Sequence, residues 1–306
     1  MLNLLILRFA ASKKIEQLIG NDIGNNSVFY SYWFMQWTFS LSILKLKYPK
    51  LKLVSRTHGA DYDENQIQTT LPFRYFQLSK VNKVFPVSQY GADYLQREFR
   101  FPKEKISVSR LGLVGQNALS PVDSTTLHIV SCSSLIPLKR VGLIIEILNQ
   151  MHIDVKWTHF GDGPLLEELV QKSKRLTDGC IVNFKGNVPN REFLSFMATT
   201  AVSIFINVSE SEGLPVSLME AISFGVPVMG TSICGVPEIV TKQTGFLIDK
   251  NFDPTEIAIL IVKNHNNGAL YLINFRNAIQ NFYYEFFYAP KNHVFLAKQL
   301  LQISQN

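Results

Sequence analysis

Two glutamates flank a predicted helix start in the segment SESEGLPVSLMEA, residues 209–221. Glu212 and Glu220 lie eight positions apart, and Pro215 between them suits the first helical turn because proline lacks an N–H that would be unpaired there. If helical geometry held throughout, the two side chains would lie about 80° apart, close enough to face one crevice. Free N–H groups at a helix start bind anions. The segment therefore indicates acceptors for hydroxyl groups beside donors for phosphate, a pairing that suits a nucleotide sugar.

A second interpretation of this segment needs no ligand. In that interpretation Glu212 is a solvated loop residue, and the helix after it is an ordinary amphipathic one. Its core face would consist of Val216, Met219, Ala221 and Ile222. Spacing alone does not separate the two interpretations, so the elements around the segment must decide.

Short β-rich runs alternate with helical patterns along the chain, which indicates βαβ units and parallel sheets. The strands are predicted at 51–57, 82–88, 105–112, 127–134, 154–161, 180–186, 202–208 and 226–232, and the clearest helices at 88–99, 139–150, 164–176 and 191–200. Ligands of open parallel sheets bind beyond the carboxyl ends of the strands. The loops GDGP (161–164), GNVPN (186–190) and SESEGLP (209–215) are therefore expected at one edge, with Lys139 at the equivalent position after the strand at 127–134.

A polar segment of small residues at 114–126 separates two such α/β regions and predicts a domain boundary. We expect a Rossmann-like N-terminal domain at 1–118 and a Rossmann-like nucleotide-sugar-binding domain at 119–290. A final helix at 291–306 is expected to pack back on the first domain. With 306 residues, 46% of them hydrophobic, the chain is long enough for two cores.

The charge of the chain is concentrated in its first 120 residues, which hold 16 Lys and Arg against 8 Asp and Glu, whereas the remainder holds 14 against 16. Such a basic region suits anionic lipid head groups or a phosphate-bearing acceptor. No nucleic-acid motif accompanies the charge, so nucleic acid is not an expected partner. The three cysteines form no Cys-x-x-Cys pair, which indicates a reducing cytoplasm without disulfides or a zinc site.

Two apolar segments near the start of the chain resemble targeting signals. Residues 1–10 carry no basic charge before the apolar run and no cleavage site after it, so secretion is not expected. Residues 27–44 are uncharged over 18 positions, near the lower limit for a membrane span, but serine, threonine and glutamine dilute their hydrophobicity. A buried strand leading into an aromatic-rich helix is favoured over a transmembrane helix. We expect a cytoplasmic protein with peripheral contact at the inner face of the membrane.

Several motifs in a fixed order resemble those of the retaining glycosyltransferases of family 4, and the similarity is nearest to bacterial enzymes that build surface polysaccharides. The motifs are SRTHGADYDE (55–64), FPVSQYGADYL (85–95), SSLIPLKRV (133–141), GDGP, FKGNV (184–188), the E-x7-E of residues 212–220, SFGVPVMGTSICGVPEIV (223–240) and TGFLID (244–249). The resemblance covers most of the chain from about residue 51 onward. It implies the α/β GT-B architecture, in which two Rossmann-like domains with parallel sheets face each other across a cleft.

The resemblance also implies roles for individual residues. Three would be catalytic: Lys139 would meet the donor's diphosphate, Glu212 the hydroxyls of the donor sugar, and His58 the donor sugar from the first domain. The substrate-binding residues would be Glu220 at the ribose, the backbone of Gly213 and Leu214 at the diphosphate, Asn187 and Val188 at the base, and Gly161 in the GDGP loop. Family members often carry an arginine where this chain has Ser134, and Arg140 or Arg56 is expected to compensate.

The implied reaction moves a hexose from a UDP- or GDP-linked sugar to a hydroxyl of a saccharide, expected to be lipid-linked, with retention at the anomeric carbon and with neither metal nor cofactor. The leaving phosphate would act as the base. A rival interpretation notes that Asp61 and Asp63 form an Asp-x-Asp pair that could hold manganese.

Two further departures from the family's pattern concern a single position and the front of the chain. Cys234 stands where glycine is usual, and residues 1–14 contain no glycine-rich loop of the kind with which family members generally begin. The first domain is therefore expected to be incomplete. The alternative function is a non-catalytic sugar-nucleotide-binding homologue or scaffold that lacks a complete acceptor site.

Overall fold

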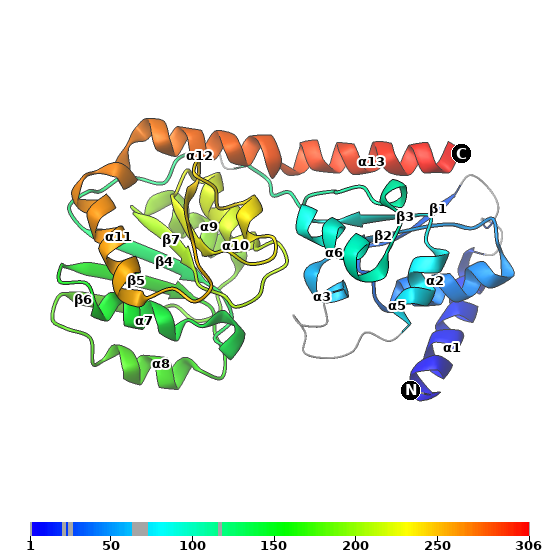
Figure 1. Ribbon diagram of the computed structural model, residues 1–306, viewed down its shortest axis with the longest axis horizontal. Coiled ribbons are helices and arrows are strands. Elements are labelled where there is room, and N and C mark those ends of the chain that lie inside the picture. The colour runs from blue at the N-terminus through cyan, green and yellow to red at the C-terminus, as the bar shows by residue number, and fades with distance from the viewer. Residues whose placement is uncertain (1, 20–22, 24–26, 63–72, 116–117, 306) are drawn as a thin grey trace. The chain divides into compact units, whose positions relative to one another are not determined.

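The computed structural model describes residues 2–19, 23, 27–62, 73–115 and 118–305, and these fall into two compact units. Unit 1 comprises Met1–Gly112 together with Ala289–Asn306, and unit 2 comprises Leu113–Tyr288 (Figure 1). Each unit contains one parallel sheet. The predicted α/β class with parallel sheets is confirmed.

Unit 2 contains a six-stranded sheet in the order β6-β5-β4-β7-β8-β9. Its strands are β4 (Leu127–Cys132), β5 (Val155–Phe160), β6 (Cys180–Phe184), β7 (Ile204–Asn207), β8 (Val228–Thr231) and β9 (Gly245–Ile248). β4 pairs with β5 along its whole length, from Leu127 opposite Val155 to Cys132 opposite Phe160. Both strands are buried over nearly every residue, as expected for a parallel sheet whose two faces are covered by helices.

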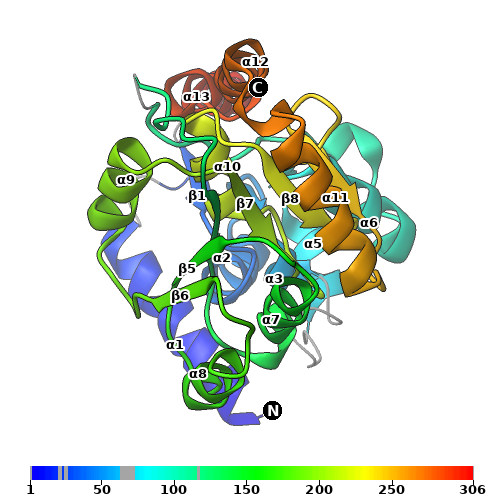
Figure 2. The same ribbon diagram turned by 90° about the vertical axis from the view of Figure 1, so that its left-hand side faces the viewer.

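Helices cover both faces of this sheet (Figure 2). On one face α7 (Gly142–Asn149) packs against α8 (Leu166–Ser173) and α11 (Pro254–Asn266), and on the other α10 (Val216–Ser223) packs against α12 (Ile273–Phe286), with α9 (Asn190–Thr199) beside them. Three 3-10 turns, η2 (Pro137–Lys139), η3 (Val236–Glu238) and η4 (Ala269–Tyr271), complete the unit. A core around the fully buried Trp157 joins the strands to the apolar faces of α7 and α11.

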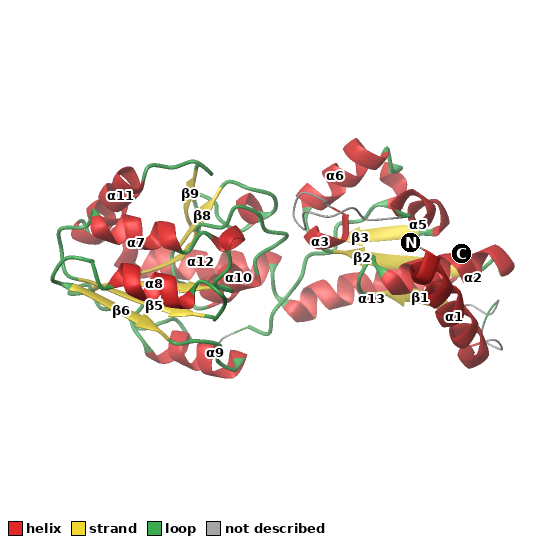
Figure 3. Ribbon diagram, turned by 90° about the horizontal axis from the view of Figure 1, so that it is seen from below, coloured by secondary structure: helices red, strands yellow, loops and turns green. Residues whose placement is uncertain are grey.

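Unit 1 contains the three-stranded sheet β1-β2-β3, formed by β1 (Val28–Ser31), β2 (Lys52–Thr57) and β3 (Lys83–Pro86) (Figure 3). Its helices are α1 (Leu2–Ile19), α2 (Gln36–Lys47), α3 (Gly59–Tyr62), α5 (Arg74–Lys80), α6 (Gln89–Phe99), the 3-10 turn η1 (Lys103–Lys105) and α13 (Ala289–Gln305). Leu296 of α13 packs on Val54 of β2 and Phe85 of β3, so the last helix belongs to the core of unit 1.

Segment 27–44 divides into β1 and the first part of α2, as the favoured interpretation predicts. None of the helices among the described residues is long and apolar enough to cross a membrane. The predicted strand at 105–112 is wrong. Ser107 and Ser109 donate backbone hydrogen bonds to Val84 and Pro86 of β3, but the segment forms only an isolated bridge at Ile106.

The structure divides the chain after Gly112 and not near residue 118. The reason is that the connecting segment hydrogen-bonds to unit 2. Leu113 N–H donates to the carbonyl of Phe287, Tyr283 Oη donates to the carbonyl of Leu113, and Ser120 Oγ donates to the carbonyl of Thr200.

We predict that Leu296→Ala lowers the free energy of unfolding by about 2–3 kcal/mol, because it removes a buried side chain between α13 and the sheet. Leu301→Ala, on the same helix, is the matched control. The Leu296 side chain is 8% exposed and the Leu301 side chain 61%. Urea unfolding should show a change below about 0.5 kcal/mol for the control. Equal losses in the two variants would contradict the assignment of α13 to this core.

Candidate functional site

A cavity of about 430 Å³ opens at the carboxyl edge of the sheet in unit 2. Its walls come from the loops after β4, β5 and β6 and from the helices α9 and α10. The lining residues are Cys132, Ser133, Ser134, Phe160, Gly161, Asp162, Asn187, Val188, Asn190, Phe193 and Glu220. A larger hollow of about 560 Å³ lies among α7, α8 and α11, on their outer side, and is lined by none of the predicted site residues.

The backbone at Gly161 shapes this cavity. Gly161 has a φ of +127°, and a Cβ at this position would lie 1.9 Å from the carbonyl oxygen of Ser133. The Gly161 N–H donates to the carbonyl of Gly186, which ties the loop after β5 to the loop after β6. Only glycine permits this close approach of three loops.

The buried acidic residue of this cavity is Glu220. It lies in α10, and its Oε1 accepts a hydrogen bond of 2.6 Å from Nδ2 of Asn190, at the start of α9. Burial raises the pKa of the Glu220 carboxyl, and the hydrogen bond from Asn190 opposes that rise. The carboxylate can accept hydrogen bonds from hydroxyl groups that enter the cavity.

A second cluster joins the loops that follow β4 and β7. Lys139 Nζ lies 2.6 Å from Oε1 of Glu212, and the two side chains are only 19% and 12% exposed. Oε1 of Glu212 also accepts hydrogen bonds from Asn207 Nδ2, at 3.1 Å, and from Ser209 Oγ, at 2.6 Å. The backbone N–H of Glu210 donates to the carbonyl of Leu138, so backbone and side chains both connect the two loops. The cluster holds a cation and a carboxylate in fixed positions.

Arg140 turns away from Lys139. Its backbone has a φ of +47°, and its guanidinium donates to the carbonyl oxygens of Val208, Ser209 and Lys250. Burial lowers the pKa of this guanidinium, and the charge of Glu210 opposes the effect. The side chain thus holds the ends of two loops together, and these contacts support a positioning role in place of the expected compensation at the diphosphate. Arg56 is similarly occupied in unit 1, where it donates to the carbonyls of Ser109 and Arg110.

Gly213 and Leu214 lie in the loop directly before α10. The carbonyl of Gly213 accepts the N–H of Gly235, where a Cβ would come within 2.2 Å of that oxygen. Leu214 is buried, so its contribution to any ligand site would come from its backbone. Cys234 has a φ of +44°, which explains why glycine suits the position before Gly235.

His58 lies in unit 1, immediately after β2. Its ring stacks on Trp33, with ring centroids 4.1 Å apart, and packs beside Tyr32. Burial, together with the charge of Arg56, lowers its pKa to about 4, so the imidazole is neutral at neutral pH. Its Nε2 is buried and has no hydrogen-bond partner within the described part of the chain. A neutral imidazole with an unpartnered nitrogen can donate or accept one hydrogen bond.

The structure brings the predicted residues of unit 2 into two groups. Gly161, Asn187, Val188 and Glu220 line the cavity, whereas Lys139 and Glu212 form the ion pair. The condition behind the 80° estimate does not hold, because α10 begins only at Val216 and Glu212 lies in the loop before it. Pro215 is the residue before the helix. Asn190 belongs to the GNVPN motif, but it lies 30 residues before Glu220 in the sequence. No local sequence pattern predicts the hydrogen bond between the two side chains.

The structure describes only one of the two aspartates of the rival manganese site. Asp63 lies outside the described residues, and Asp61 is buried with Oδ2 accepting from the N–H groups of His58 and Phe34. Within the described ranges, no three His, Cys, Asp or Glu side chains come together as a metal-binding group.

Two solved structures share this fold. The lipopolysaccharide outer core galactosyltransferase WaaB superposes with a TM-score of 0.78 at 14% identity, over 94% of this chain and 79% of WaaB. HepE of Anabaena, solved in complex with UDP, superposes with a TM-score of 0.77 at 17% identity, over 94% of this chain and 81% of HepE. These likenesses show that the chain has the GT-B fold.

The family follows from sequence comparison. Residues 119–281 match the family described as Glycosyl transferases group 1, and the chain belongs to that family. WcaL of Escherichia coli (strain K12), whose name assigns it to colanic acid biosynthesis, is 29% identical over 213 residues. The match covers 65% of this chain and 52% of WcaL, so the chain spans about half the length of that relative.

We predict that Gly161→Ala destabilises unit 2 by more than about 3 kcal/mol, because the added Cβ collides with the carbonyl of Ser133 and φ is positive. Gly186→Ala is the matched control, since Gly186 has a φ of +66° but a Cβ added there would have no atom within 4 Å. The control should cost only about 1 kcal/mol. Thermal unfolding measures both variants. A similar small loss in both would show that the close approach of the loops is not required.

Proposed function

We propose that this protein transfers a hexose from a nucleoside diphosphate sugar to a hydroxyl of a saccharide, with retention at the anomeric carbon, in the synthesis of a bacterial surface polysaccharide or lipopolysaccharide. The observation that carries the proposal is the cavity at the carboxyl edge of the unit 2 sheet, where Glu220 and three loops converge. The complex of HepE with UDP and the name of WcaL are consistent with this donor class and pathway class.

The donor's nucleoside would occupy the cavity. Glu220 would accept hydrogen bonds from the ribose hydroxyls through its carboxylate, while Asn190 holds Oε1. Asn187 and Val188, after β6, would contact the base mainly through their backbone groups. Gly161 leaves room because no side chain projects from the loop after β5 at this position.

The diphosphate would lie against Lys139 and the N-terminus of α10. Lys139 is a compact cation, and the N–H groups of Gly213 and Leu214 precede a helix whose N-terminus carries positive partial charge. Together they would stabilise the charge that develops as the nucleotide departs. This supply of positive charge is the basis for proposing a metal-independent reaction. Glu212, held by Lys139, Asn207 and Ser209, would present its carboxylate to hydroxyls of the donor sugar.

In the proposed step the acceptor oxygen forms a bond to the anomeric carbon on the face from which the phosphate leaves. The bond from that carbon to the phosphate oxygen breaks, and the acceptor's proton passes to the departing phosphate. His58 would meet the donor sugar from unit 1 as a neutral imidazole. An NMR assay of the product tests this scheme, since inverted configuration at the anomeric carbon would exclude it.

The acceptor is proposed to be a saccharide, or a lipid-linked saccharide, presented at the cytoplasmic face of the membrane. The excess of basic residues in the first 120 positions supports contact with an anionic surface.

We predict that Lys139→Ala and Glu220→Ala each weaken binding of the donor by at least about tenfold, because each removes a charge-assisted hydrogen bond. Calorimetric titration with UDP, GDP, UDP-glucose and GDP-mannose, with and without EDTA, measures the effect and identifies the base. Lys172→Ala and Glu167→Ala are controls of the same charge change on the exposed surface of α8. No binding of any of the four by the unmodified chain would refute the donor site.

We further predict that donor binding weakens as pH falls through the raised pKa of Glu220, because protonation removes a carboxylate acceptor. Asn190→Leu removes the hydrogen bond that lowers this pKa, so the midpoint of the acid side should move to higher pH. UDP-glucose is the suitable ligand, since its diphosphate carries no proton that titrates in this range. Asn187→Leu, in the same cavity, should change affinity without moving the midpoint. An unchanged midpoint in Asn190→Leu would show that Glu220 does not govern binding.

A further inference from the structure

A second polar cavity, of about 310 Å³, lies at the amino edge of the sheet in unit 1. It is found where α2 and α5 end and where β2 and β3 begin. Three lysines from different elements converge on it: Lys45 from the last turn of α2, Lys80 from the end of α5 and Lys105 from η1. The other lining residues are Pro49, Ser79, Val81 and Asn82. The lining thus draws lysines from three elements and, among the described residues, includes no carboxylate. The ammonium of Lys80 also lies 5.7 Å from the centroid of the Phe76 ring.

The position of Lys45 is fixed. Its ammonium donates to Oδ1 of Asn82, and the same oxygen accepts the backbone N–H of Leu53 at the start of β2. Lys45 is half-buried, and burial together with the charges of Lys105 and Lys80 lowers its pKa to about 8. None of the three lysines forms an ion pair within the described residues. Lys47, in the same last turn of α2, is instead paired with Glu16.

Lysines at helix ends have an ordinary explanation, because the C-terminus of a helix carries negative partial charge. That explanation accounts for Lys45 and Lys80 separately. It does not account for Lys105, which joins them from η1, and it predicts a raised pKa for Lys45 where the surroundings lower it. The cavity brings like charges together against their mutual repulsion, and an anion between them would remove that cost.

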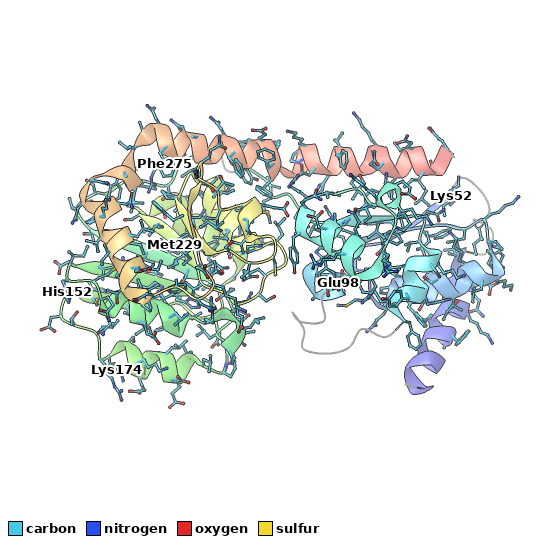
Figure 4. All side chains as sticks on the ribbon, viewed as in Figure 1. Lys52, Glu98, His152, Lys174, Met229 and Phe275 are labelled. Atoms are coloured by element: carbon cyan, nitrogen blue, oxygen red, sulfur yellow. The ribbon has the colours of Figure 1, made fainter. Side chains whose placement is uncertain are left out.

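A neighbouring cavity extends the basic surface. It measures about 490 Å³, shares Pro49 and Asn82 with the first, and adds Lys50 and Lys52. Lys52, which is labelled in Figure 4, donates to the carbonyl of Ser304 near the end of α13. Ile303 of that helix lines the same cavity. Five lysines therefore follow the amino edge of β2 and β3.

We propose that the cavity lined by Lys45, Lys80 and Lys105 is a binding site for a phosphate or diphosphate group. Ammonium groups and the amide of Asn82 are donors that suit phosphate oxygens. The group could be carried by the head group of an anionic lipid or by a small soluble ligand, and the two sources share the same chemistry. The site lies on unit 1 at the edge of the sheet opposite to His58, and it does not depend on the donor site proposed in unit 2.

Two binding experiments distinguish the sources. The first is calorimetric titration with pyrophosphate, carried out on full-length Lys139→Ala protein so that the contribution of the proposed donor site is reduced. The second is co-sedimentation with phosphatidylglycerol vesicles and with phosphatidylcholine vesicles at fixed ionic strength. Each experiment compares the parent protein with two double variants. One pair combines Lys45→Gln with Lys105→Gln, and the other combines Lys80→Gln with Lys105→Gln. The second pair leaves the half-buried Lys45 intact in case its replacement impairs folding.

The matched control is Lys14→Gln with Lys103→Gln, which removes the same charge from exposed positions of unit 1 outside the cavity. We expect both cavity pairs to weaken binding by about thirtyfold and the control pair by much less. Loss of pyrophosphate binding identifies a soluble ligand, whereas loss of phosphatidylglycerol binding alone identifies a lipid head group. Absence of binding in both assays, or equal losses in the cavity and control pairs, overturns the proposal.

Discussion

The order of strands in unit 2 is the constraint on which the candidate site depends. From β4 the chain proceeds outward through β5 to β6 and then crosses back to β7, on the other side of β4. β4 and β7 are therefore neighbouring strands at the point where the strand order reverses, and the loops that follow them begin side by side. Lys139 and Glu212 come from these two loops, so their ion pair joins the loops. The site is thus a property of the sheet's topology before it is a property of any side chain.

The loops at this edge are held by backbone contacts as much as by side chains. Gly161 and Gly235 permit approaches that any Cβ would prevent, and Arg140 binds three carbonyl oxygens at the ends of two loops. Because these contacts fix the backbone of the loops, they also fix the positions from which the Lys139 and Glu220 side chains extend. A positioned cation stabilises a developing negative charge more effectively than a mobile one, since the cost of ordering the cation is met during folding.

The sequence could reveal five of the six strands of unit 2, because each is a short apolar run between helical patterns, and β4, β5 and β6 lie within a few residues of their predicted bounds. It could place Gly161, Asn187, Val188 and Glu220 at one edge for the same reason. The strand β9 is not among the predicted ones. Contacts between distant residues have no such local signal. The pairing of Lys139 with Glu212 joins positions 73 residues apart. The direction of the Arg140 side chain depends on a left-handed backbone angle, which the residue type arginine does not predict.

The two carboxylates of the E-x7-E segment occupy different environments despite their shared motif. Glu212 accepts hydrogen bonds from an ammonium group and two neutral donors, which hold its carboxylate in one place. Glu220 is buried beside the single amide donor of Asn190, and burial raises its pKa. In the proposed function, the first carboxylate is therefore suited to present a fixed acceptor to the donor sugar. The second is suited to neutral hydroxyl partners such as those of a ribose, whose hydrogen bonds would replace the water that burial excludes.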